Sequence, residues 1–262
     1  MRATMAPGAG SKKTTSRRSA AETRTMVLAT ALDALEHDGL KLDLRALNMN
    51  DLIRNAGVSR SAVRRIWTSN KMFYLDLIEA MAEPERRRDA VLDEGTMRVA
   101  DAVLTEYKHL RDSERGRRAV LREMIRQAVT HNFETNHRKL AWRTYAALTA
   151  ALPSLIDENH QRARDILAAA DARDTRLMAE FYQQMMNELG LRFRAGFDAD
   201  IFATTASSLI GGLAMRRFIS QSIPTTTRLP GVEGGPVDWH YAAAGFMAII
   251  DGMTEPDSGL RN

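Results

Sequence analysis

The 262-residue sequence contains no cysteine and no long run of apolar residues. Without cysteine, the chain has no disulfide scaffold, no zinc site with cysteine ligands and no thiol nucleophile. None of its apolar runs approaches the ~18 residues that a membrane-spanning helix needs. Glycine (16) and proline (7) are too scarce for a fibrous or low-complexity protein, while 44% hydrophobic and 27% charged residues are typical of a globular chain. We therefore expect a soluble, cytoplasmic protein that does not contact a membrane.

Positive charge is concentrated near the N-terminus. Residues 1–71 carry a net charge of +7, whereas residues 72–262 carry −3. A basic segment on a nearly neutral body is typical of proteins that bind a polyanion such as DNA, although a basic segment that only keeps the chain soluble explains the charge equally well. Residues 1–20 combine small and basic residues without hydrophobic periodicity, which predicts a disordered basic arm.

Apolar residues recur at three- and four-residue steps along most of the remaining chain, a pattern that predicts helices. The sustained alternation typical of strands is missing throughout. We therefore predict an all-α fold with a three-helix head over residues 21–82 and a larger helical body over residues 83–262. In the body we expect helices near 85–112, 117–135, 137–151, 156–194, 199–220 and 237–253. The one long irregular stretch is expected between Ser222 and Pro236.

The most informative pattern lies in residues 48–67, NMNDLIRNAGVSRSAVRRIW. Asn48 and Ser59 are good N-cap residues for two short helices, and Gly57 supplies the left-handed conformation that ends the first one. The apolar residues of the second helix fall on one face, which leaves Arg60, Ser61, Arg64 and Arg65 pointing outward. This arrangement predicts a helix-turn-helix whose second helix enters the major groove of DNA. An ordinary helical hairpin with a solvated basic face is the alternative, but it does not explain the agreement between caps, turn and outward arginines.

The same segment resembles the DNA-binding head of TetR-type transcriptional regulators. The resemblance covers about residues 22–80 and rests on AGVS at 56–59, the aromatic Trp67 and SNKMFYLDLI at 69–78. The AGVS sequence is the most specific of these features, because it lies at the turn with the expected apolar spacing on both sides. The body is similar to that family only in being helical and of suitable length.

Three positions of the head depart from the family's usual pattern. Ile53 stands where a small residue is common, and Asn70 replaces a common lysine, with Lys71 one position later. Arg64 replaces a tyrosine that touches a phosphate in the family, and a guanidinium binds phosphate more strongly than a phenol does. The candidates for contact with double-stranded DNA are Asn48, Ser59, Arg60, Ser61, Arg64, Arg65, Trp67 and Lys71.

The resemblance also implies that the body binds a small molecule. One predicted helix carries a stripe of methionine and aromatic side chains, which suit an adaptable apolar pocket. The alternative for each of these residues is an ordinary place in the core. The candidate pocket residues are Met124, Phe133, Trp142, Tyr145, Met178, Phe181, Tyr182 and Met185.

A homodimer is the second property that the resemblance implies for the body. The last two predicted helices have apolar surfaces with many small residues, which favour a four-helix interface between two copies. Packing of these helices within one chain is the alternative. The candidate interface residues are Phe202, Ala206, Leu209, Leu213, Phe246 and Ile250.

The sequence contains no recognisable catalytic motif. A P-loop, a GxGxxG after a strand, HExxH and GxSxG are all missing. His131, Glu134 and His137 come nearest to a metal site, but their spacing spreads them around a helix and indicates a solvated polar face. We therefore expect no enzymatic activity, no cofactor and no metal ion.

The leading hypothesis is a homodimeric DNA-binding transcriptional regulator, a repressor released from its operator by a small apolar ligand. The ligand would favour a spacing of the two heads that no longer matches successive major grooves. One alternative is a protein that binds DNA constitutively, or through another regulator, without an effector. Another is a helical enzyme with an incidental basic head, for which the sequence offers no catalytic residues.

Overall fold

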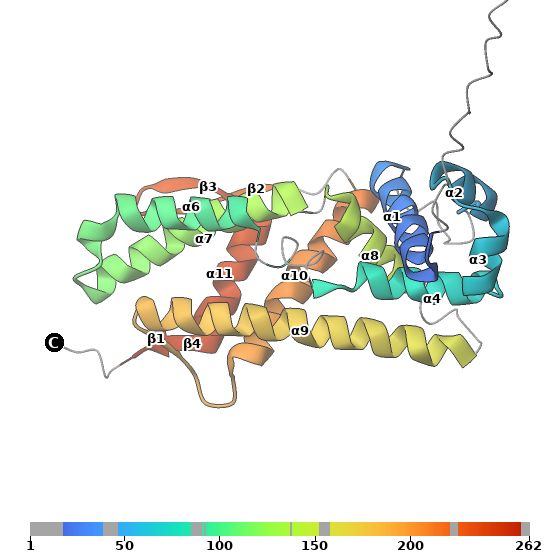
Figure 1. Ribbon diagram of the computed structural model, residues 1–262. Helices are drawn as coiled ribbons and strands as arrows, with labels where there is room; N and C mark the ends of the chain where they lie inside the picture. Colours follow the sequence, from blue (N-terminus) through green and yellow to red (C-terminus); the bar gives the residue numbers. More distant parts are fainter. Residues whose placement is uncertain are drawn as a thin grey trace, which may run out of the picture.

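A computed structural model describes residues 18–38, 47–84, 91, 93–136, 138–151, 158–220 and 225–257. These residues form a helical head joined to a larger helical body, so the predicted all-α class is confirmed (Figure 1). The predicted basic arm lies outside the described residues except for its last three. No helix in the described ranges is long and apolar enough to cross a membrane.

The head contains four helices and not the three predicted, because α4 contributes Phe73 and Leu77 to its core. They are α1 (Ala20–Asp38), α2 (Met49–Asn55), α3 (Arg60–Ile66) and α4 (Asn70–Met81). One face of each helix contributes to a small hydrophobic core of its own. This core contains Val27, Ala31, Leu35, Leu52, Val63, Trp67, Phe73 and Leu77. The head therefore holds α3 in place through apolar contacts that are separate from the core of the body.

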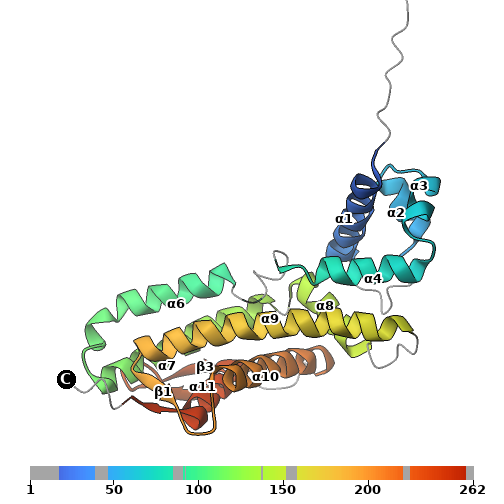
Figure 2. The same ribbon diagram turned by 60° about the horizontal axis from the view of Figure 1, so that its bottom comes forward.

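The body is built from longer helices around a second core. They are α6 (Glu94–Glu106), α7 (Glu114–Asn136), α8 (Leu140–Ala151), α9 (Glu158–Glu188), α10 (Ala199–Ile219) and α11 (Tyr241–Met253). Figure 2 shows the head at one end of an elongated body, with α9 running along the body toward it. Three rings from different helices stack edge to face at the centre: Phe202 lies 5.0 Å from Tyr182 and 5.7 Å from Phe246 between ring centroids. Such ring pairs add to the stabilisation from apolar burial.

Helix α4 connects the two parts. It packs along α9, and Leu75 and Ile78 on α4 share a small buried cluster with Leu148 on α8 and Leu167 on α9. These shared buried side chains place α4 in contact with both the head and the body.

The prediction that no strands occur is wrong for two short ribbons. Strand β1 (Leu191–Phe193) pairs with β4 (Thr254–Pro256), and β2 (Thr226–Pro230) pairs with β3 (Pro236–His240), both antiparallel. Strands of three or five residues are too short to show sustained alternation, so periodicity did not reveal them. The hairpin β2–β3 occupies most of the stretch expected to be irregular.

Three predicted helix boundaries also differ from the structure. The helix expected from residue 237 begins at Tyr241, because β3 occupies the preceding residues. The helix expected to reach residue 194 ends at Glu188, where Gly190 adopts a positive φ of 68° that stops the helix. The helix expected over 85–112 is α6 followed by the short 3-10 helix η2 (Lys108–Leu110), and residues 85–90 lie outside the described part of the chain.

Candidate functional sites

The predicted helix-turn-helix is present, with the expected caps. The side chain of Asn48 accepts a hydrogen bond from the amide of Asn50 at 2.9 Å, and Ser59 Oγ accepts one from the amide of Ala62 at 3.2 Å. Gly57 has a φ of 62° at the turn, a conformation that favours glycine. Caps and turn therefore fix the orientation of α3 relative to α2 locally.

Helix α3 presents a basic surface to solvent. Val63 points into the head core, and the side chains of Arg60, Ser61, Arg64 and Arg65 are exposed on the other side of the helix. Asn48, Ser59 and Lys71 are exposed as well. Seven of the eight residues predicted to contact DNA are therefore accessible, although Asn48 and Ser59 already use their side chains as caps.

Trp67 is the exception, and its assignment to the DNA-contacting set is wrong. Only 5% of the residue is exposed. Its indole N–H donates a hydrogen bond to Asp76 Oδ2 at 2.7 Å, and its ring meets Phe73 edge to face at 5.2 Å. Asp76 Oδ2 also accepts a hydrogen bond from Arg24 Nε at 2.9 Å. Trp67 therefore ties the end of α3 to α4 and α1, and it fixes the position of α3 within the head.

Arg18 provides a contact that the sequence did not reveal. Its Nη1 donates a hydrogen bond to the backbone oxygen of Gly57 at 2.7 Å. Ser19 and Glu22 cap the start of α1 reciprocally, each accepting from the other's backbone amide. The end of the basic arm is therefore anchored beside the turn of the helix-turn-helix.

The body contains a cavity of about 560 Å³. All eight residues predicted for a pocket line it: Met124, Phe133, Trp142, Tyr145, Met178, Phe181, Tyr182 and Met185. Burial raises the pKa of the Tyr182 hydroxyl to about 12, so this phenol stays neutral at physiological pH. The volume falls within the range of small-molecule sites in proteins.

Sequence reasoning missed two groups of residues in the cavity wall. Leu32 and Leu35 of α1 and Met81 of α4 come from the head, so the cavity touches both parts of the molecule. A polar group also lines it, comprising Asp93, Thr96, Asn132, Asn136, Asp171 and Asp174. Helical periodicity identifies apolar faces, and it assigns polar residues to solvent unless the tertiary structure is known.

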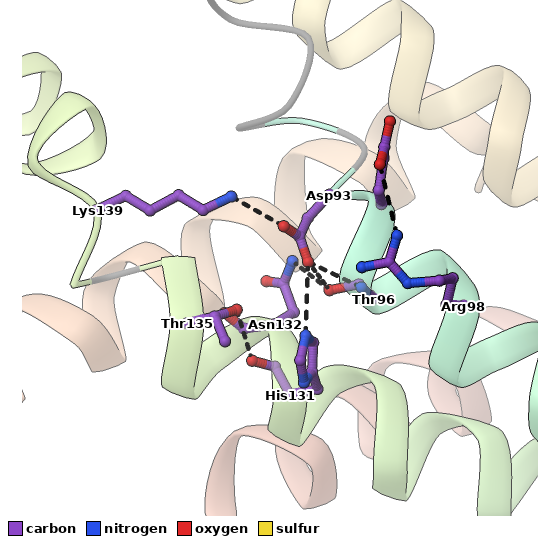
Figure 3. A network of polar contacts seen from close by, with 8 residues as sticks. Asp93, Thr96, Arg98, His131, Asn132, Thr135 and Lys139 are labelled. Atoms are coloured by element: carbon purple, nitrogen blue, oxygen red, sulfur yellow. Dashed lines mark hydrogen bonds and ion pairs between the residues drawn. The ribbon is translucent and has the colours of Figure 1, made fainter.

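Asp93 is the centre of a polar network beside the cavity (Figure 3). Its Oδ2 accepts hydrogen bonds from the amide and hydroxyl of Thr96, both at 2.8 Å, and its Oδ1 accepts one from Lys139 Nζ at 2.8 Å. The Thr96 hydroxyl in turn accepts a hydrogen bond from Asn132 at 3.3 Å. Burial alone would raise the pKa of Asp93, but the bonds from Lys139 and Thr96 outweigh it and the pKa is lowered.

A lowered pKa makes the stability contributed by Asp93 depend on pH. The contribution is complete above the ordinary carboxyl value of 3.8 and is lost as the pH falls through the lower pKa of the folded state. Asp93→Asn keeps a capping oxygen and removes the charge, so we expect it to lower the free energy of unfolding by about 1–3 kcal/mol at neutral pH. The difference from the wild type should be smaller at acidic pH, below the ordinary carboxyl value of 3.8, than at neutral pH in urea titrations followed by circular dichroism.

Asp101→Asn is the matched control, because Asp101 is exposed on α6, the helix that Asp93 caps. It should change the free energy of unfolding by no more than about 0.5 kcal/mol at either pH. A difference between wild type and Asp93→Asn that stays constant over this pH range would contradict the assigned role of the charge.

The residues predicted for the dimer interface fall into two groups. Phe202, Ala206, Phe246 and Ile250 are buried in the core of a single chain, so for these four the intramolecular alternative is correct. Leu209 and Leu213 are half-buried and remain partly accessible. The same helix exposes other apolar side chains, Ile201, Met215 and Ile219, the last of which is 86% exposed.

Comparison with known proteins shows a shared fold. The sequence matches no family model and no curated protein. Among solved structures, the chain is similar to Escherichia coli NemR in its reduced form, with a TM-score of 0.51, 15% identity and coverage of 90% of this chain and 99% of NemR. This likeness shows that the chain shares the fold of NemR.

Two further solved structures are similar at lower scores. A protein from Rhodococcus sp. assigned as a TetR-family transcriptional regulator has a TM-score of 0.44 and 19% identity, covering 88% of this chain and 98% of its own. A protein from Saccharomonospora viridis, assigned as a transcriptional regulator and solved with choline, has a TM-score of 0.46 and 17% identity. The match covers 90% of this chain and 99% of that protein.

Proposed function

We propose that this protein is a homodimeric transcriptional regulator of the TetR type, a repressor that a small ligand releases from its DNA operator. The observation that carries the proposal is the exposed basic surface of α3, which Arg60, Arg64 and Arg65 form on a capped and rigidly packed helix-turn-helix. Arginine side chains on a recognition helix suit both base edges and phosphates. Trp67 and Asp76 support the role by fixing α3 against the rest of the head.

The cavity supports the effector part of the proposal. Its wall combines Leu32 and Leu35 of the head with Met178 and Met185 of α9. A ligand that fills the cavity contacts both parts, so it binds one relative orientation of head and body more tightly than another. Such differential binding shifts the population toward that orientation and changes the spacing of two heads in a dimer.

The exposed surface of α10 supports assembly into a dimer. Ile201, Met215 and Ile219 leave apolar side chains in solvent. Gly211 lines the cavity, whereas Gly212 is exposed and an added Cβ there would meet no atom within 4 Å, so the packing of the single chain does not require glycine at position 212. A glycine inside a helix costs about 0.5–1 kcal/mol relative to alanine. Close approach of a second helix explains why this cost is tolerated.

The proposal is tested by selecting bound sequences from a random DNA pool with the full chain. A two-fold symmetric protein with one recognition helix per head should enrich an inverted repeat with half-sites about one helical turn apart. Compounds that raise the melting temperature of the free protein should then release the selected DNA in a mobility-shift assay. Failure to enrich any sequence would refute the DNA-binding role. Enrichment without any compound that releases the DNA would favour a constitutive DNA-binding protein.

The basic arm should add affinity for DNA that does not depend on sequence. Arg18 places the end of the arm beside the helix-turn-helix, and the arm carries Lys12, Lys13 and Arg17 before it. Removing residues 1–17 leaves the Ser19 cap in place, and we expect it to make the dependence of log affinity on log salt concentration shallower by roughly one unit per lost phosphate contact.

Fluorescence anisotropy over a series of salt concentrations measures this slope. A full-length variant with Arg2, Lys12, Lys13 and Arg17 changed to glutamine is the control for charge, and it should reproduce the effect of the deletion. An unchanged slope in both proteins would mean that the arm does not touch DNA.

A further inference from the structure

All charged residues in the described part of the cavity wall are acidic. Its described residues include three aspartates, Asp93, Asp171 and Asp174, and no lysine, arginine or histidine. The charge of Asp93 is met by Lys139, whose ammonium lies 2.8 Å away. The carboxylates that α9 brings to the wall, Asp171 and Asp174, are spaced three residues apart and therefore lie on one face of that helix. The part of the wall that α9 supplies is therefore acidic, with Asp171 exposed to solvent and Asp174 half-buried.

Asn136 supplies an open hydrogen-bond acceptor in the same wall. Only 7% of the residue is exposed, and its side-chain oxygen Oδ1 is buried without a hydrogen-bond partner. The neighbouring polar groups are already engaged, because Asn132 donates to Thr96 and Thr96 donates to Asp93. A buried acceptor without a partner costs about 1–3 kcal/mol, which a ligand with an N–H or O–H group would recover.

The position of Asn136 adds to the negative potential. It is the last residue of α7, a helix of 23 residues, and the C-terminal end of a helix carries a partial negative charge that stabilises cations. The aromatic rings of Trp142 and Tyr145 line the cavity too, and the faces of such rings also attract cations.

The rest of the wall that α9 supplies consists of methionine and aromatic residues. Going along α9 from Asp174, the next residues in the wall are Met178, Phe181, Tyr182 and Met185, followed across the cavity by Phe246 of α11. Along α9 the cavity wall therefore changes from carboxylates at Asp171 and Asp174 to methionine and aromatic side chains between Met178 and Met185.

We propose that the cavity binds a protonated primary or secondary amine with an apolar body. The ammonium donates a hydrogen bond to Asn136 Oδ1 and is stabilised by Asp171 and Asp174, and the apolar body packs against Met178, Tyr182 and Met185. This inference rests on the proposed function, in which the cavity takes an effector, and it names the chemical class of that effector.

Four matched probes test the assignment by isothermal titration calorimetry with the full chain: 3,3-diphenylpropylamine, the corresponding alcohol, the corresponding carboxylate and the trimethylammonium analogue. The amine should bind at least about tenfold more tightly than the alcohol, because a hydrogen bond to a charged group is worth more than a neutral one. It should also exceed the trimethylammonium analogue, which has the charge but no N–H donor. The carboxylate should bind most weakly.

Variants of the cavity wall measure the contribution of the carboxylate charges to binding separately from that of the hydrogen bond to Asn136. The double change Asp171→Asn with Asp174→Asn should remove most of the preference for the amine over the alcohol. Asp165→Asn with Glu180→Gln is the control, because it removes two exposed carboxylates from the same helix that do not line the cavity. The control should retain the full preference.

Asn136→Leu should weaken binding of the amine about tenfold and leave the trimethylammonium analogue unchanged, since the latter cannot donate to Asn136. Asn136→Asp is a second variant that keeps the polar character of the site, and it should tighten binding of the amine. The assignment is overturned if the alcohol or carboxylate binds as tightly as the amine, or if both variants at Asn136 leave the affinity for the amine unchanged. Either of these results contradicts only the proposed ligand class, and the cavity can still bind an effector of another kind. If none of the four probes binds, the effector part of the proposed function is contradicted as well.

Discussion

Changing Arg60, Arg64 and Arg65 together to alanine is expected to reduce operator affinity at least about a hundredfold without unfolding the protein. Each arginine that reads a base or pairs with a phosphate contributes about 1–3 kcal/mol, and the three losses act at both heads of a dimer. All three side chains are exposed, while Val63 and the Ser59 cap hold α3 in place. The variant should therefore keep the melting temperature of the wild type.

Binding is measured by fluorescence anisotropy on the selected operator. The matched control removes three exposed arginines from the body, Arg98, Arg115 and Arg176, and lowers the net charge by the same amount. Equal loss of affinity in both triple variants would show that total charge, and not the surface of α3, determines binding. Normal affinity in the α3 variant would refute the assignment of the recognition helix.

The second large effect is expected at the dimer interface proposed for α10. Met215→Glu should convert the dimer to a folded monomer, because in a two-fold interface the new charge appears twice and must be buried. Met215 is 45% exposed in the single chain, so the substitution should cost little folding energy by itself. Leu213 is a less discriminating position, because it packs partly against the core of its own chain.

Met72→Glu is the control for this experiment, since Met72 is also 45% exposed but lies on the head. Mass in solution, measured by light scattering, should be halved for Met215→Glu and unchanged for Met72→Glu, with equal helical circular dichroism. The monomer should also bind the operator far more weakly, because one head loses the partner that occupies the second half-site. A Met215→Glu protein that remains dimeric would place the interface on another surface of the body.

The helix-turn-helix was predictable because its signals are local. Asn48, Ser59 and Gly57 specify the ends of two helices within a few residues of themselves, and the structure places all three as expected. The stripe on α9 was predictable for a related reason: Met178, Tyr182 and Met185 share a face by helical spacing alone, and that face lines the cavity.

Other features depend on partners that are distant in sequence. The burial of Trp67 follows from its bond to Asp76, and a single aromatic residue after a helix does not reveal whether it faces DNA or the core. The polar part of the cavity joins Asp93 before α6 to Lys139 before α8, a separation of 46 residues. Neither residue is distinguishable in sequence from a solvated surface charge.

Leu32 and Leu35 line the cavity and are also part of the hydrophobic core of the head. A substitution there that enlarges the cavity removes packing from the head, and Leu→Ala at such buried sites costs about 2–5 kcal/mol. Ligand preference and head stability are therefore inseparable at these two positions. A mutant library intended to respond to new inducers should keep Leu32 and Leu35 fixed and randomise Met178, Tyr182 and Met185. Substitutions at these three positions of α9 remove packing from the body and leave the core of the head intact.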